Sequence, residues 1–141
     1  MPTVSYEHEF SYRHEGAGRF PIVQIRISNP ADPALSLDVD GYLDSGATAS
    51  LFPGWMAQAL GFELLAGPPR QYVSAGGPEF DARVHTVQIA EINETDASPF
   101  LLDVGFGTGN VHRNILGRDF FNQIQIGFRE RQLLFFMTPS P

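Results

Sequence analysis

Apolar and polar residues alternate along much of the chain with a period of two, which is typical of half-buried β-strands. Residues 23–28 alternate in this way, and a break with two prolines follows them. A second alternating strand, residues 35–43, runs directly into Asp44. Its polar face carries Asp38 and Asp40, which we expect to face solvent or a partner. The pattern therefore predicts a β-rich chain whose second strand delivers a carboxylate at its end.

A short helix is predicted after these strands, over residues 53–60. Pro53 suits its first turn and Gly61 suits its C-terminal cap. Trp55 and Met56 lie on its apolar side, and we expect both to pack in the core.

The second half of the chain again predicts strands joined by turns. Extended segments at 70–75 and 80–89 flank a Gly-Gly-Pro sequence, which predicts a β-hairpin. We expect residues 90–99 to form a polar connection or hairpin turn, residues 100–104 a strand, and residues 105–109 a flexible loop with three glycines. A strand ending at Leu116, a short helix from about Arg118 and a closing hairpin over 124–137 complete the pattern.

The closing hairpin contains the apolar run 133–137. Such a run would make a poor exposed edge in a monomer. It either builds a dimer interface or forms a core strand within one subunit, and the sequence leaves both readings open.

Composition and charge limit the classes of function. The length of 141 residues fits one domain over residues 1–141, without internal repeats. The formal net charge of -7 disfavours binding to nucleic acids and to anionic membranes. The N-terminal residues 1–8 are polar, without the regions of a secretory signal, and no apolar run approaches a membrane span. We therefore expect a cytoplasmic protein.

Metal and thiolate chemistry find no support in the sequence. There are no cysteines, and the four histidines lack the spacing of metal ligands. We expect no metal and no cofactor.

Two sequence blocks stand out as candidates for chemistry. The first is the Asp-Ser-Gly triplet at 44–46, which ends an apolar strand and is followed by a small residue, Ala47. The second, about seventy residues later, is Ile-Leu-Gly-Arg-Asp at 115–119. The two blocks together resemble the retropepsin-like family of aspartic peptidases, in its bacterial and cellular form, over about residues 35–136.

The resemblance implies a fold and a reaction. The fold is all-β, a small, partly closed barrel of the acid-protease type with one or two short helices, and it is half of a symmetric dimer. Peptide hydrolysis in this family uses two carboxylates that share one proton and hold a water between them, because like charges a few ångströms apart cannot both ionise.

A single chain supplies only half of such a pair. The sequence contains one Asp-Ser-Gly, and the segment 103–105, Asp-Val-Gly, lacks the hydroxyl residue. The second carboxylate must therefore come from another chain, most simply from Asp44 of an identical chain across a twofold axis. We expect a homodimeric endopeptidase that acts on peptide or protein substrates.

The neighbours of Asp44 take roles by the same resemblance. In the family, the hydroxyl at the position of Ser45 joins the backbone of the opposite loop. The amide of Gly46 can hold the Asp44 carboxylate in plane, and Ala47 keeps the site narrow.

Ala75, Gly76 and Gly77 lie where the family places the tip of its flap. Two such hairpins would close over an extended substrate and exclude water. A plain solvent-exposed hairpin is the alternative, and the sequence does not separate the two.

Gly117 and Arg118 are expected to be structural. In the family, this arginine pairs with an acidic residue shortly after the catalytic triplet. Here Thr48 and Ala49 follow the triplet, so Arg118 needs another partner, such as a backbone carbonyl or Asp119.

Two other functions remain open at this point. One is a catalytically silent dimeric module of the same fold, which binds peptides or serves assembly. The other is an unrelated β-domain. A silent module has no reason to keep Asp44, so the triplet favours the enzyme.

Overall fold

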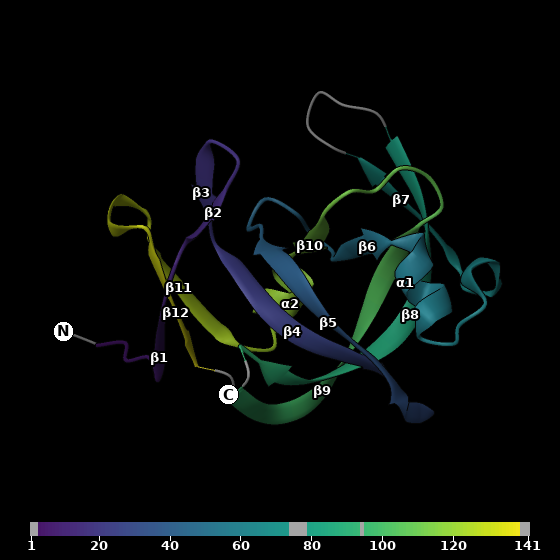
Figure 1. Ribbon diagram of the computed structural model, residues 1–141, viewed down its shortest axis with the longest axis horizontal. Coiled ribbons are helices and arrows are strands. Elements are labelled where there is room, and N and C mark those ends of the chain that lie inside the picture. The colour runs from purple at the N-terminus through teal and green to yellow at the C-terminus, as the bar shows by residue number, and fades with distance from the viewer. Residues whose placement is uncertain (1–2, 74–78, 94, 139–141) are drawn as a thin grey trace.

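β-strands make up most of the chain, as the alternating pattern predicted. The computed structural model describes residues 3–73, 79–93 and 95–138 (Figure 1). In chain order the strands are β1 (His8–Ser11), β2 (Arg13–Glu15), β3 (Gly18–Phe20), β4 (Ile22–Asn29), β5 (Asp32–Leu43), β6 (Leu51–Pro53), β7 (Pro69–Val73), β8 (Glu79–Ile92), β9 (Thr95–Gly107), β10 (Asn114–Leu116), β11 (Gln125–Arg129) and β12 (Leu134–Thr138). The helical elements are α1 (Gly54–Ala59), α2 (Arg118–Phe121) and the 3-10 turns η1 (Leu64–Ala66) and η2 (Glu130–Gln132).

Six strands close into a small barrel. The main sheet has the order β4-β5-β10-β6-β9-β8-β7, and an additional pairing of β4 with β8 joins its two sides. β7 stays outside the closed ring and, among the described strands, pairs only with β8. This arrangement confirms the predicted all-β barrel with short helices.

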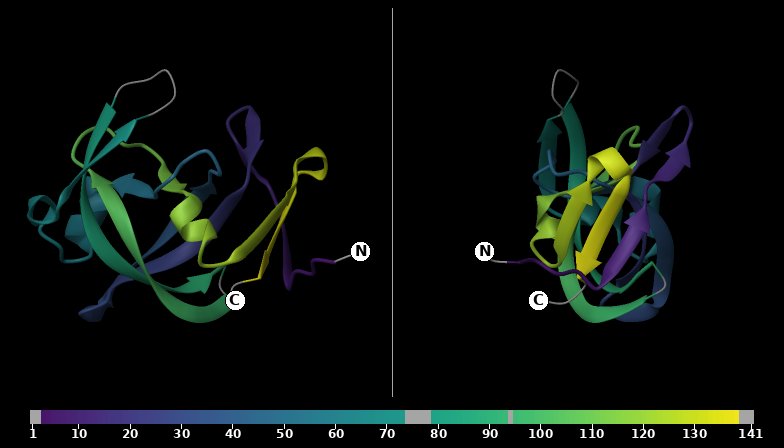
Figure 2. Two further views of the ribbon diagram at one scale, coloured as in Figure 1. Left: turned by 180° about the vertical axis from the view of Figure 1, so that it is seen from behind. Right: turned by 90° about the vertical axis from the view of Figure 1, so that its left-hand side faces the viewer.

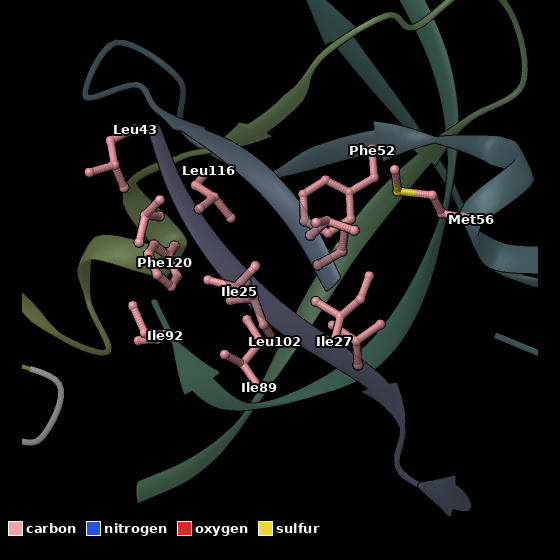
Figure 3. Close-up of a cluster of buried hydrophobic side chains, with 14 of the residues drawn as sticks. Ile25, Ile27, Leu43, Phe52, Met56, Ile89, Ile92, Leu102, Leu116 and Phe120 are labelled. Carbon is pink, nitrogen blue, oxygen red and sulfur yellow. The ribbon is translucent and has the colours of Figure 1, made fainter. Parts of the chain in front are cut away.

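The barrel interior holds the apolar faces of the strands. Val23, Ile25 and Ile27 of β4 are at most 1% exposed, and Figure 3 shows Ile25 and Ile27 among the labelled side chains of this cluster. The helix α1 and the residue that follows it close one side of the core with the buried side chains of Met56, Ala57 and Leu60. Burial of each large apolar side chain contributes about 1.5–3 kcal/mol, so these side chains dominate the stability of the barrel.

A second sheet, of the order β1-β12-β11, lies beside the barrel (Figures 1 and 2). β12 is its central strand, with β1 and β11 on either side. Phe135 and Met137 of β12 are buried in the same core cluster as the barrel residues. The run 133–137 is therefore a core strand within one subunit at Phe135 and Met137, whereas Leu133, Leu134 and Phe136 are only half-buried and their place in a dimer interface stays a prediction. β1, β2 and β3 were not predicted, because their short polar sequences carry no clear alternation.

One other expectation was met in part and two were wrong. Residues 90–99 do contain a turn, at Asn93 with a positive φ of 49°, but most of the segment belongs to β8 and β9, which pair as antiparallel strands from Ile92 and Thr95. Gly105 and Gly107 lie inside β9 and pair with β6 and β8, so they form no flexible loop. Trp55 is 59% exposed, because α1 is so short that only its Met56 side is covered.

Three segments reach the same end of the molecule. They are the loop after β5, the β2–β3 hairpin, and the C-terminal end of β7 with the N-terminal end of β8, which all extend upward in Figure 1 and in the reversed view of Figure 2. No helix within the described ranges is long and apolar enough to cross a bilayer.

A buried tyrosine makes the stability of this fold sensitive to alkaline pH. Burial, and then a hydrogen bond donated to Glu130, raise the pKa of Tyr12 from 10.0 to about 12. Because the pKa is higher in the folded state, the contribution of Tyr12 to stability is complete below about pH 10 and is lost as the pH rises toward about 12. The sequence has no lysine and no cysteine, so the other side chains that titrate in this window are the three remaining tyrosines, and burial also raises the pKa of Tyr42 and Tyr72.

We therefore expect the free energy of unfolding to fall between about pH 10 and 12, and Tyr12→Phe to reduce that fall. Denaturant titrations at a series of pH values measure both. If the free energy of unfolding fell as steeply with pH in Tyr12→Phe as in the wild type, Tyr12 would not be responsible for the fall.

Candidate active site

Asp44 lies where β5 ends, and the fold brings the second sequence block directly beside it. β5 and β10 pair in parallel, with Leu43 opposite Leu116. The Asp44 amide donates a hydrogen bond of 2.9 Å to the carbonyl of Leu116. The two blocks that are about seventy residues apart in sequence are thus joined at one point of the barrel wall.

The loop of residues 44–50, called the Asp44 loop below, begins with a tight turn. The Gly46 amide donates a 2.9 Å hydrogen bond to Oδ1 of Asp44, as predicted, and the Ala47 amide donates one of 3.1 Å to the Asp44 carbonyl. A Cβ atom at position 46 would lie 3.2 Å from Oδ1, so a larger residue would crowd the carboxylate. Asp44 and Ser45 are both exposed, and no hydrogen bond holds the Ser45 hydroxyl within the described part of the chain.

Ser50 anchors the other end of the Asp44 loop and is fully buried. Its amide and its hydroxyl donate hydrogen bonds of 2.9 and 2.7 Å to the two carboxylate oxygens of Asp119. Its hydroxyl accepts a bond of 3.1 Å from the Gly117 amide. Its carbonyl accepts from the Tyr72 hydroxyl at 2.6 Å and from the Gly105 amide at 3.1 Å. Every polar atom of Ser50 is therefore paired, which fixes this end of the loop.

Gly117 and Arg118 hold α2 against the Asp44 loop through their backbone. A Cβ atom on Gly117 would lie 2.8 Å from the Ala47 carbonyl oxygen and about as close to backbone atoms of Ala49, so only glycine fits. The Arg118 amide donates a 2.9 Å hydrogen bond to the same Ala47 carbonyl.

The expected partner of the Arg118 side chain is not seen. That side chain is exposed and makes no hydrogen bond or ion pair with any of the residues that the structure describes. Asp119, one of the suggested partners, is instead occupied by Ser50. The arginine of the family motif thus acts here through its amide.

An apolar hollow of about 420 Å³ opens beside Asp44. It is lined by Asp44, Gly46, Ala47, Ala49, Leu51, Tyr72, Val73, Phe80 and Ile115. Asp44 is the only carboxylate among these described residues, so the hollow presents one acid against an apolar wall.

Several lining residues were not singled out from the sequence. Leu51, Val73, Phe80 and Ile115 come from four different strands, and their strands meet only in the folded barrel. The sequence did offer a signal for Ile115. It precedes the buried Leu116 in a strand, and because successive side chains of a strand point to opposite faces, Ile115 faces outward. Ala75, Gly76 and Gly77 fall outside the described residues.

Metal ligands do not gather anywhere in the described ranges. No group of three or more His, Asp or Glu side chains there could hold a metal ion. The chemistry that this arrangement can offer is that of an oriented carboxylate in an apolar groove.

The barrel and the oriented aspartate define the class of fold, and comparisons with known proteins agree with it. A crystal structure of a retropepsin-like aspartic protease from Rickettsia conorii aligns with a TM-score of 0.59 and 20% identity, covering 98% of this chain and 97% of that one. The EIAV protease in complex with the inhibitor HBY-793 is a distant likeness only, which aligns over 78% of this chain and 92% of that one at 19% identity and a TM-score of 0.42.

The sequence itself matches a known family. Residues 23–120, more than half of the chain, match the family described as aspartyl protease. The chain therefore belongs to the aspartyl protease family, and its fold is retropepsin-like. No curated protein matches it.

Proposed function

We propose that this protein is an aspartic endopeptidase whose active unit is a homodimer, with Asp44 of each chain forming the catalytic pair. The observation that carries this proposal is the position of Asp44. It is exposed, its carboxylate is oriented by the Gly46 amide, and it is the one acid among the described residues that line the apolar hollow. A lone carboxylate open to solvent is a weak catalyst, whereas two that share a proton can act as base and acid together.

The proposed reaction uses water as its nucleophile. The ionised carboxylate of the pair takes a proton from a water, whose oxygen attacks the carbonyl carbon of the peptide bond. The protonated carboxylate gives its proton to the carbonyl oxygen, so a neutral tetrahedral intermediate forms. When the C–N bond breaks, a proton passes to the leaving nitrogen, and the pair again holds one proton. Asp44 and the partner subunit's Asp44 can fill either role because the two are related by symmetry.

The loop neighbours support a dimer at this end of the molecule. The Ser45 hydroxyl is exposed beside Asp44 and is left without a hydrogen bond inside the described chain. We propose that it donates to the backbone of the partner's loop, which would hold the two carboxylates at a fixed separation. Gly46 and Ala47 are small, so they leave room for the partner's loop to come close to Ser45.

The proposed substrate is an extended peptide with apolar side chains. Val73 on the wall of the hollow is 73% exposed, which is a costly position for an apolar side chain unless something covers it. Leu51, Phe80 and Ile115 complete an apolar lining that would receive substrate side chains, while strand-like backbone pairing would hold the peptide.

We also infer that residues 1–141 form one domain. The second sheet and the barrel bury their side chains in a single cluster, to which Phe135 and Met137 belong together with Phe52 and Phe106. A shared core of this kind leaves no boundary between the two sheets.

The direct test is hydrolysis of an unfolded protein between about pH 4 and 6, where a carboxylate pair holds one proton. We expect the wild-type chain to cleave it and Asp44→Asn to leave it intact. Binding of a statine-type inhibitor without any turnover would instead identify a silent module of the same fold.

A further inference from the structure

One tyrosine connects the two walls of the groove, and the following inference rests on the function proposed above. Tyr72 belongs to β7, which forms one wall, and its hydroxyl donates a 2.6 Å hydrogen bond to the carbonyl of Ser50 in the Asp44 loop. Tyr72 lines the hollow that contains Asp44. A second hollow of about 360 Å³ lies between the same two segments, lined by residues 46–49 and 70–73. The Tyr72 side chain therefore bridges a gap that is otherwise open on both sides.

The fold makes room for this bridge at one glycine. A Cβ atom on Gly105 would lie 2.4 Å from the Tyr72 hydroxyl and 2.7 Å from its ring. Any side chain at position 105 would thus displace the ring from its place above β9. The Gly105 amide also donates to the Ser50 carbonyl, so the two residues converge on the same acceptor.

Arg70 keeps the hydroxyl in its donor role. Its Nη1 donates a 3.1 Å hydrogen bond to the Tyr72 oxygen, and its guanidinium carbon lies 5.9 Å from the ring centroid. Because the oxygen accepts from Arg70, its own proton is directed to Ser50. Burial raises the pKa of Tyr72, so the hydroxyl keeps this proton over the working range of the enzyme.

The bridge ends on the most firmly held residue of the loop. Ser50 is bonded to Asp119 and to Gly117, and the loop runs from it back to Asp44. Among the strands that the structure describes, β7 pairs with β8 alone. Tyr72 therefore gives β7 a second attachment that does not pass through β8.

We infer that Tyr72 is a positioning residue that sets the spacing between the β7 wall and the Asp44 loop, and so the width of the groove in which the peptide is held. Asp119 still holds Ser50 when the bridge is removed, so the orientation of Asp44 does not depend on it. The bridge therefore acts on substrate binding more than on the chemical step.

The test compares Tyr72→Phe with Tyr12→Phe. Both variants lose one tyrosine hydroxyl that donates a hydrogen bond, but Tyr12 bonds to Glu130 in η2, the turn between β11 and β12, and neither residue lines the hollow. We expect Tyr72→Phe to raise KM by about 3- to 10-fold, the range that one hydrogen bond supports, with kcat changed less than about twofold. Tyr12→Phe is expected to change neither. Gly105→Ala, which keeps the hydroxyl but displaces the ring, is expected to raise KM in the same way.

Amide hydrogen exchange supplies a second readout that needs no substrate. In Tyr72→Phe we expect faster exchange in β7 and, at the same time, at Ser50, the residue of the Asp44 loop on which the bridge ends, with Gly46, Ala47 and α1 unchanged. An unchanged KM in Tyr72→Phe, or faster exchange confined to β7, would overturn the inference. A wild-type protein that cleaves nothing would instead refute the proposed function, and the exchange data would still decide whether Tyr72 couples the two walls.

Discussion

Asp44→Asn is expected to lower kcat for peptide hydrolysis by on the order of 10³-fold or more, because a dimer of this variant has no group that can take a proton from water. The amide is nearly the same size as the carboxyl group, and its oxygen can still accept the 2.9 Å hydrogen bond from Gly46. The loop and the fold should therefore be retained. Initial rates on an unfolded protein substrate, with circular dichroism as a check on folding, measure this effect.

Asp103→Asn provides a matched control. Asp103 belongs to the Asp-Val-Gly segment at 103–105, is exposed on β9 and does not line the hollow. The same chemical change there should leave kcat within about twofold, as surface substitutions away from a site usually do. If Asp44→Asn kept full activity, or if Asp103→Asn lost it, the carboxylate would have been assigned to the wrong residue.

Asp119→Ala is the second change with a large expected effect. It removes the acceptor for the Ser50 amide, the Ser50 hydroxyl and the Phe120 amide. Leaving buried donors without partners is expected to destabilise the fold by about 2–4 kcal/mol. The freed loop end should also let Asp44 shift, which we expect to lower kcat by about 10- to 100-fold. Denaturant titration and kcat measured at a temperature where the variant is folded check the two effects separately.

Asp32→Ala serves as the control for this substitution. Asp32 is exposed at the start of β5, far along the strand from Asp44. The control should change stability by less than about 0.5 kcal/mol. A stability for Asp119→Ala equal to that of the control would show that the buried bonds to Ser50 contribute nothing.

Much of the site could be predicted because its main signals are local in sequence. The alternation of residues 35–43 indicated a strand with one buried face, and the triplet at its end placed Asp44 at the strand terminus. The orienting bond from Gly46 was expected from the family resemblance, and it is present. The glycine at 117 was expected to be structural, and the close backbone of Ala47 and Ala49 gives the reason.

The remaining features depend on contacts between distant segments. Gly105 was interpreted as part of a flexible loop because glycines favour turns. In the fold it lies within β9, and the space above it is taken by Tyr72 from a strand more than thirty residues earlier. Ser50 gave no signal as an anchor, since its partner Asp119 belongs to the second sequence block. β1 to β3 were missed because short polar strands are set by their pairing partners and not by their own pattern.

The sharing of one proton between two chains can be tested most directly with mixed dimers. Wild-type and Asp44→Asn chains are unfolded together in equal amounts, refolded and assayed at constant total protein. If each active unit needs Asp44 from both chains, only about a quarter of the dimers are active, and activity should follow the square of the wild-type fraction. A loss of only half the activity, linear in that fraction, would show that one chain works alone and would contradict the account.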